Sequence, residues 1–134
     1  ALAQKDGIQF EARVFIPSVL PFQSGHLAII FGNLLENALE ACRKLPQEQR
    51  YIMLEATYIK EMLQICIKNG SPEKLKKDNS GRYLTTKKDT SCHGIGLASV
   101  EQALADYDGE LFTQYENGEF QASAVLYSNS IEEK

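Results

Sequence analysis

The sequence has no tryptophan and no long apolar run, and it holds only three cysteines among 134 residues. No stretch approaches the roughly 18 apolar residues that a membrane-spanning helix needs, and the first residues do not resemble a secretory signal. Cys42, Cys66 and Cys92 are odd in number and lack metal-ligand spacing, which indicates free thiols in a reducing compartment. The net charge of −4 gives no overall signature of nucleic-acid binding.

Length and composition predict a single folded unit. The 134 residues fit one domain, residues 1–134, and the shares of hydrophobic (43%) and charged (24%) residues are those of an ordinary globular protein. Because the chain begins without Met, we expect it to be part of a longer protein.

Residues 26–45 hold the clearest periodic pattern of the chain. Apolar side chains recur there at steps of three and four, which predicts an amphipathic core helix: Leu27, Ile30, Phe31, Leu34, Leu35, Ala38, Leu39 and Cys42. Asn33 and Asn37 lie four residues apart beside this stripe, so at about 100° per residue they share one face. Asparagine is a mediocre helix former. The pair is therefore either a polar border of the stripe or two amides that face a site.

Alternating patterns predict strands before and after this helix. Residues 8–16 alternate apolar and polar side chains, which is typical of a half-buried strand. Residues 50–58 and 62–69 alternate in the same way, and the short turn at Lys60-Glu61 predicts that they form a hairpin. Asn69 is in phase with the apolar residues of its strand, so it either faces the covered side of the sheet or belongs to an Asn-Gly turn.

The second half of the chain holds another helix and another hairpin. The apolar edge Leu97, Val100 and Leu104 predicts a helix that runs to about residue 106. Tyr107 to Tyr115 and Phe120 to Tyr127 read as strands around a turn at Asn117-Gly118. The order strand, helix, hairpin, loop, helix, hairpin predicts a two-layer α/β sandwich, a mixed sheet with helices on one face.

A basic segment, residues 70–93, separates the first hairpin from the second helix. It carries little periodicity and an excess of Lys and Arg, although the whole chain is net negative. A structureless loop of this length is often a lid or a binding loop. It leads into His93-Gly94-Ile95-Gly96-Leu97, where glycines at a predicted helix start would let a phosphate approach the backbone N–H groups.

These motifs together resemble the catalytic and ATP-binding domain of sensor histidine kinases, in the GHKL superfamily shared with gyrase and the heat-shock-90 chaperones. Residues 33–38, NLLENA, are similar to the N-box of that family, and residues 93–97, HGIGL, to its glycine box. LLENALEA, followed by TTKKD and HGIGL, resembles the subgroup that includes peptide quorum-sensing receptors. The resemblance covers residues 5–128 and implies a Bergerat-type ATP-binding fold, with three helices on one side of a mixed sheet.

The resemblance also implies roles for individual residues in a site for ATP and Mg²⁺. Asn37 takes the position of the asparagine that ligates Mg²⁺, and Asn33 that of a supporting residue near the phosphates. Asn69 replaces the acid that accepts a hydrogen bond from the adenine amino group. The basic segment corresponds to the ATP lid, from which Lys87 or Lys88 would neutralise phosphate charge. The phosphates would rest on His93, Gly94, Ile95, Gly96 and Leu97.

Three features depart from the family pattern. The first glycine box, DxGxG, is replaced by residues 69–72, NGSP, and Glu40 stands where many kinases have a basic residue. No phosphoacceptor histidine is present. For His26 we expect a loop or capping role, and for His93 a local hydrogen bond or lid contact.

The function implied is that of a protein-histidine kinase. The domain would bind Mg-ATP and donate the γ-phosphate to a histidine on a separate dimerisation domain of the same kinase, which signals to a response regulator. The resemblance further implies a monomeric cytoplasmic domain of a membrane-anchored parent. No catalytic side chain is expected in this chain, so its own ATP turnover should be slow. The alternatives are a nucleotide- or partner-binding module without phosphotransfer, and an anti-sigma-factor-type serine protein kinase.

Overall fold

The computed structural model describes the backbone of residues 7–72, 76–77, 83–84 and 90–128, and the side chains of residues 7–72 and 97–128. Its elements are β1 (Gln9–Phe15), α2 (Ser24–Arg43), a short 3-10 helix (Gln47–Gln49), β2 (Tyr51–Ile59), β3 (Met62–Gly70), β4 (Lys76–Lys77), β5 (Tyr83–Leu84), α3 (Thr90–Ala105), β6 (Glu110–Glu116) and β7 (Glu119–Tyr127).

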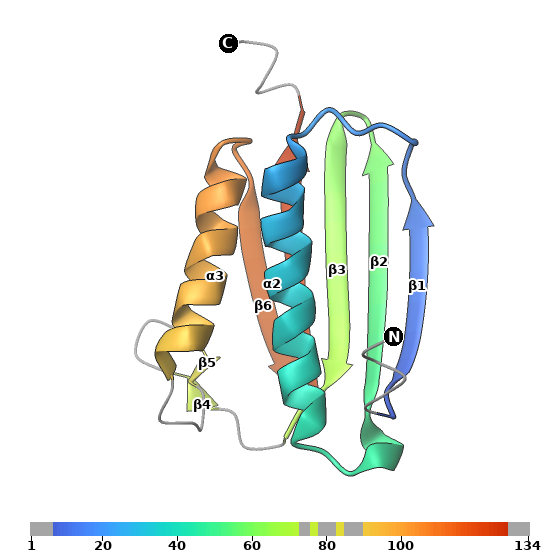
Figure 1. Ribbon diagram of the computed structural model, residues 1–134, viewed down its shortest axis with the longest axis vertical. Coiled ribbons are helices and arrows are strands. Elements are labelled where there is room, and N and C mark those ends of the chain that lie inside the picture. Colours follow the sequence, from blue (N-terminus) through green and yellow to red (C-terminus); the bar gives the residue numbers. More distant parts are fainter. Residues whose placement is uncertain (1–6, 73–75, 78–82, 85–89, 129–134) are drawn as a thin grey trace.

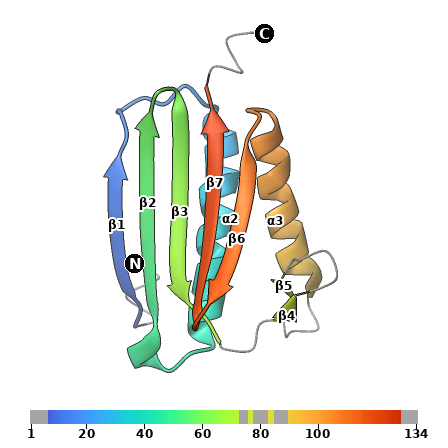
Figure 2. The same ribbon diagram turned by 180° about the vertical axis from the view of Figure 1, so that it is seen from behind.

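The main sheet has five strands in the order β1-β2-β3-β7-β6. β1 runs parallel to β2, and the other neighbours are antiparallel. Both α-helices of the described residues lie on one face of this sheet, and the opposite face carries no described helix (Figures 1 and 2). The predicted two-layer α/β sandwich is therefore confirmed. Within the described residues it has two α-helices, not the three that the resemblance implied.

The predicted central helix is α2, which begins at Ser24 and ends at Arg43. Its buried residues recur every four positions and pack on the sheet: Ile30, Leu34, Ala38 and Cys42. Opposite them lie small and branched side chains of β3 and β7, including Ile65, Ile67, Ala122 and Ala124. The prediction that Cys42 belongs to the core is confirmed. Burial raises the pKa of its thiol, which donates to the carbonyl oxygen of Tyr51 at 3.3 Å.

Both predicted hairpins are present, and their turns explain their register. Lys60 and Glu61 have φ values of 53° and 64°, while Asn117 and Gly118 have 51° and 80°. Positive φ at both central residues defines the type I′ turn, whose twist matches that of the flanking strands. Tyr107, however, was predicted to start a strand. It lies in the turn after α3, three residues before β6 begins at Glu110.

The prediction that residues 8–16 form a half-buried strand is wrong in its burial for every residue but Ile8, which is 6% exposed and belongs to the core. β1 is a strand, but every residue from Gln9 to Phe15 is exposed. Its register places Phe10 beside Ile52 and Val14 beside Ala56, on the face that the helices cover elsewhere. β1 forms the edge of the sheet, however, and α2 and α3 lie over the strands farther in (Figure 1). Phe10 and Val14 therefore remain 46% and 48% exposed.

The basic segment also differs from its prediction as a structureless loop. Within it, β4 and β5 pair antiparallel as a separate two-stranded sheet. Its predicted limits shift as well, because Gly70 is the last residue of β3 and α3 begins at Thr90. No helix in the described part of the chain is long and apolar enough to cross a membrane.

Candidate functional site

Asn33 and Asn37 lie on the flank of α2 that faces α3. His26 precedes them by about two and three helical turns, so the three residues share one face of the helix. The His26 side chain contacts Tyr107 and Asp106, which directly follow α3. The same face therefore carries Asn33 and Asn37 along α3, and both side chains are partly buried there.

The two asparagines differ in their hydrogen bonds. The Nδ2 group of Asn33 donates to the carbonyl oxygen of Ile29, one turn earlier, at 2.8 Å. This bond orients the Asn33 amide within its own helix. The Asn37 amide makes no hydrogen bond to any residue that the structure describes. No donor among the described residues occupies the Asn37 amide oxygen, and a neutral amide oxygen is a ligand that a hard cation accepts.

Asn69 is a buried polar residue on the helix-covered face of the sheet. It lies next to the end of β3, in phase with the buried Ile65 and Ile67, and is 2% exposed. Its Nδ2 group donates to the carbonyl oxygen of Gly70 at 2.9 Å. Its Oδ1 atom has no donor among the described residues. Because a buried acceptor without a donor costs about 1–3 kcal/mol, this oxygen suits a ligand that supplies an N–H group.

Contacts between β2, β3 and β7 hold together the end of the sheet that carries Asn69. Gly70 pairs with Glu119 of β7, and the Tyr51 hydroxyl donates to Glu119 Oε2 at 2.6 Å, across β3. Burial, followed by the hydrogen bond to Glu119, raises the pKa of Tyr51. The hydroxyl therefore stays protonated and keeps donating at neutral pH. These contacts hold the strand ends on both sides of Asn69 in place.

The glycine box lies inside α3 rather than before it, so the predicted helix start is wrong. α3 begins at Thr90, and residues 93–97 fall within its first turns. The side chains of residues 93–96 are not described, whereas Leu97 is partly buried and packs against the core. Lys87 and Lys88 lie outside the described residues.

These parts meet at one end of the molecule. α2 and α3 run in opposite directions, so the first turns of α3 lie toward the end of α2 that follows Asn37 (Figure 1). β3 ends on the same side, and with it Asn69. Asn69 and the first turns of α3 therefore lie toward the end of the molecule to which α2 continues after Asn37.

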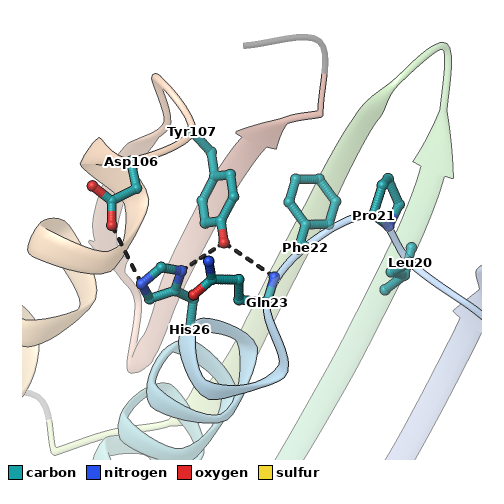
Figure 3. Close-up of a pocket in the computed structure, with 7 residues that line it drawn as sticks. All are labelled: Leu20, Pro21, Phe22, Gln23, His26, Asp106 and Tyr107. Atoms are coloured by element: carbon teal, nitrogen blue, oxygen red, sulfur yellow. Dashed lines mark hydrogen bonds and ion pairs between the residues drawn. The ribbon is translucent and has the colours of Figure 1, made fainter. Parts of the chain in front are cut away.

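A polar cluster at the opposite end was missed at the sequence level. The Tyr107 hydroxyl accepts a hydrogen bond from the Gln23 N–H group at 3.1 Å and contacts His26 Nδ1 (Figure 3). His26 Nε2 lies 3.3 Å from Asp106 Oδ2. His26 therefore connects the start of α2 with the end of α3, which is neither the loop nor the capping role predicted for it. No sequence pattern pairs residues 81 positions apart.

These residues, with Leu20, Pro21 and Phe22, line a cavity of about 420 Å³ (Figure 3). Tyr107 is 2% exposed, and its ring packs edge to face against Phe22.

Replacing Tyr107 with phenylalanine should destabilise the domain by about 1–3 kcal/mol, because the Gln23 N–H group and His26 lose a buried partner. Asp106→Asn is the matched control. The Asp106 side chain is 60% exposed, so its pair with His26 should contribute less than about 1 kcal/mol. Urea unfolding of both variants measures the difference. An equal loss of stability in the two variants would contradict the expected contribution of the Tyr107 hydroxyl.

Comparison with solved structures places this α/β sandwich among histidine kinase catalytic domains. The nucleotide-free catalytic domain of histidine kinase ThkA matches with a TM-score of 0.73 and 16% identity, over 96% of this chain and 86% of that one. The mycobacterial sensor histidine kinase MprB matches with a TM-score of 0.67 and 19% identity, over 94% of this chain and 86% of that one. Full-length ShkA in complex with AMPPNP matches with a TM-score of 0.68 and 20% identity, over 92% of this chain but only 26% of the ShkA chain. At these identities the likeness shows the fold.

Comparison with curated proteins gave no match. A family model settles the membership: residues 23–126 match the GHKL domain, so the chain belongs to the GHKL family. Membership in this family implies ATP binding.

Proposed function

We propose that this domain binds Mg-ATP and donates the γ-phosphate to a histidine on a separate dimerisation domain of the same kinase. The observation that carries the proposal is the buried Asn69 Oδ1 atom, which lacks a donor among the described residues and lies at the same end as Asn37. An adenine amino group supplies such a donor. The likeness to histidine kinase catalytic domains supports this choice within the GHKL family.

Each part of the site has a distinct task. Asn69 binds the base, and Asn37 offers an amide oxygen to Mg²⁺, a hard cation that takes most of its other ligands from phosphates and water. Asn33 supports the phosphates from one turn earlier. The backbone of residues 93–97 lies beside the phosphates, and Lys87 and Lys88 neutralise their charge. Bound Mg²⁺ adds further neutralisation. Phosphoryl transfer needs mainly such positioning and charge compensation, so the domain needs no nucleophile of its own.

The proposal extends to the parent protein. We place the chain in a sensor kinase of the quorum-sensing-receptor type, as the catalytic domain on the cytoplasmic side of a membrane anchor. Its direct partner is the dimerisation domain, and the response regulator receives the phosphoryl group afterwards. The single domain comprises residues 1–134, is monomeric by itself, and carries the ATP lid in the basic segment.

Titration with ATP and a non-hydrolysable analogue, with and without Mg²⁺, tests the first step. We expect Mg²⁺-dependent binding of both nucleotides. Addition of a histidine-containing dimerisation domain and γ-labelled ATP then tests the transfer. Label on the histidine supports the kinase, and binding without transfer supports a non-catalytic module. Label on a serine of a partner protein would favour the serine kinase alternative.

The chain alone should hydrolyse ATP slowly or undetectably, because the proposed base and acceptor lie on the dimerisation domain. Phosphate release from the isolated domain measures this rate. Fast hydrolysis would contradict the placement of the base outside this chain.

A further inference from the structure

We propose that the outer edge of β1 binds a second copy of this chain. The two β1 strands pair antiparallel about a two-fold axis at Ala12, which joins the two five-stranded sheets into one. The inference goes beyond the proposed ATP site, because it uses only the edge strand of the sheet and the side chains on it.

β1 is an edge strand that lacks the features that commonly protect such an edge. It pairs with β2 without interruption from Gln9 to Phe15, and no described strand pairs with its other side (Figure 1). Natural edge strands are often protected by proline, lysine, a bulge or a charge that points inward. β1 has no proline, lysine or bulge, and its charged residues, Glu11 and Arg13, point away from the helices. Its outer edge is therefore open to another strand.

The backbone groups at this outer edge belong to Phe10, Ala12 and Val14. The Gln9 N–H group donates to the Arg50 carbonyl oxygen at 3.1 Å, so the backbone of Gln9 points toward β2. Successive residues direct their N–H and C=O groups to alternate sides of a strand, so the even-numbered residues point outward. An antiparallel second copy centred on Ala12 sets Phe10 opposite Val14 and Ala12 opposite Ala12. Each such pair exchanges two hydrogen bonds.

The charges of β1 select this register. The Glu11 and Arg13 side chains are 55% and 59% exposed and lie 3.6 Å apart on the same face. With the axis at Ala12, Glu11 of each copy lies directly opposite Arg13 of the other, in the pairs whose side chains come closest. An axis at position 11 or 13 would instead set two glutamates or two arginines opposite each other, which is destabilising. The strand is thus self-complementary in one register, as a two-fold contact requires.

The opposite face of β1 contributes apolar contacts to the same pairing. Phe10 and Val14 lie on the face of the sheet that carries the helices, and they remain 46% and 48% exposed. Each Phe10 lies opposite Val14 of the second copy, on either side of the two central alanines. Pairs of an aromatic and a β-branched side chain stabilise antiparallel strands. Pairing therefore covers apolar surface that the single domain leaves in water.

The other edge of the sheet does not offer this match. A second copy of β6 that paired antiparallel along its whole length would set Glu110 opposite Glu116 at both ends. Like charges that lie directly opposite each other destabilise a strand pair. The complementary edge is therefore that of β1.

The contact is small. β1 contributes seven residues, whereas a stable interface uses roughly 20–30 residues on each side. We therefore expect a weak dimer, with a dissociation constant on the order of 0.1–1 mM, and a monomer in dilute solution. Such a contact forms where two copies are held close together, as on the parent kinase of the proposed function.

Small-angle scattering from about 10 µM to about 1 mM protein measures the association. The apparent mass of the unmutated chain should rise from that of one chain toward that of two. Glu11→Arg and Arg13→Glu should each weaken the association about tenfold or more, because two attractive pairs become repulsive. Glu36→Arg is the matched control. It reverses an exposed charge on α2, and it should dimerise like the unmutated chain.

A mixture of the two reversed variants tests the register. In a heterodimer of Glu11→Arg with Arg13→Glu, every arginine again lies opposite a glutamate. The mixture should therefore associate at concentrations at which neither variant associates alone. Each reversal changes the net charge of −4 by two units, so both variants stay net negative and general attraction between them does not explain the recovery. The double variant, in which both residues are exchanged, should dimerise like the unmutated chain.

Ala12→Cys tests the position of the axis. Opposite residues of a hydrogen-bonded antiparallel pair have Cα atoms about 5.5 Å apart, which a disulfide can span. Mild oxidation should therefore link two copies through residue 12. Val14→Cys is the control, because the two copies of residue 14 lie about 13 Å apart along the strands. Peptide mass spectrometry distinguishes the expected link from links through Cys42, Cys66 or Cys92.

Three results would overturn the inference: the mass of one chain at every concentration, a dimer that persists equally in both reversed variants, or a mixture of these variants that does not associate. Growth beyond two chains would also overturn it, because a closed two-fold contact ends at the dimer. None of these measurements involves a nucleotide, so their outcomes are distinct from a failure of the proposed ATP binding.

Discussion

Asn37→Ala should abolish the Mg²⁺-dependent part of ATP binding while the domain stays folded. The Asn37 amide faces the α3 side of α2 and has no hydrogen bond to the described residues, so its removal leaves none of the described groups unpaired. Alanine is also the better helix former, by roughly 0.5 kcal/mol. Removal of a partner outside the first shell of a metal typically lowers the affinity 10- to 100-fold. Removal of a side chain that contacts the metal directly should cost more, so we expect Mg²⁺-dependent binding to weaken by about 100-fold or more.

Isothermal titration with ATP, with and without Mg²⁺, measures this loss. Asn33→Ala is the matched control, because the same chemical change is made one turn earlier on the same face. It removes an amide already bonded to the Ile29 carbonyl and should weaken binding by less than about tenfold, or 1.4 kcal/mol. A Mg²⁺ effect in Asn37→Ala equal to that of the unmutated chain would rule out Asn37 as the metal ligand.

Leu34→Ala, in contrast to Asn37→Ala, should greatly lower the free energy of unfolding. Leu34 is 2% exposed and packs within the core cluster between α2 and the sheet. Deleting a buried leucine side chain costs about 2–5 kcal/mol, because the lost burial is compounded by the cavity that remains. That is a large part of the roughly 5–15 kcal/mol that stabilises a domain.

Urea unfolding, followed by far-UV circular dichroism, gives the free energy of unfolding. Glu36→Ala is the control, since Glu36 is an exposed residue of the same helix and its replacement should stay within about 0.5 kcal/mol. A Leu34→Ala variant as stable as Glu36→Ala would contradict the placement of the apolar stripe in the core.

The sequence predicted those elements whose apolar periodicity or turn type depends on residues close together in the chain. The apolar stripe of α2 and the Asn117-Gly118 turn depend on neighbours three or four positions away at most, and both are where the patterns indicated. The burial of β1 was mispredicted because alternation shows only that a strand has two different faces. Whether Phe10 is covered depends on where α2 crosses the sheet, and that is decided by tertiary packing.

The candidate site also combines features that the sequence predicts with features that only tertiary packing decides. Asn37 stood out as an amide beside the apolar stripe of its helix, and Asn69 as an amide in phase with the apolar residues of its strand. The structure places α2 and the buried Asn69 side chain on the same face of the sheet. That Asn69 Oδ1 has no donor among the described residues could not be predicted from the sequence, because it depends on every neighbour of a buried atom. The same holds for Tyr107 and His26, whose contact joins segments on opposite sides of the glycine box.

The exposed position of β1 has a consequence for the behaviour of the domain in concentrated solution. In the described part of the chain no strand pairs with the outer edge of β1, so its backbone N–H and C=O groups can pair with another molecule. Phe10 and Val14 add an apolar surface beside that edge. The net charge of −4 provides an electrostatic repulsion between copies that opposes such pairing. The outer edge of β1 is therefore a surface along which copies of the domain can associate, and the solubility of the domain depends on how well this edge is shielded.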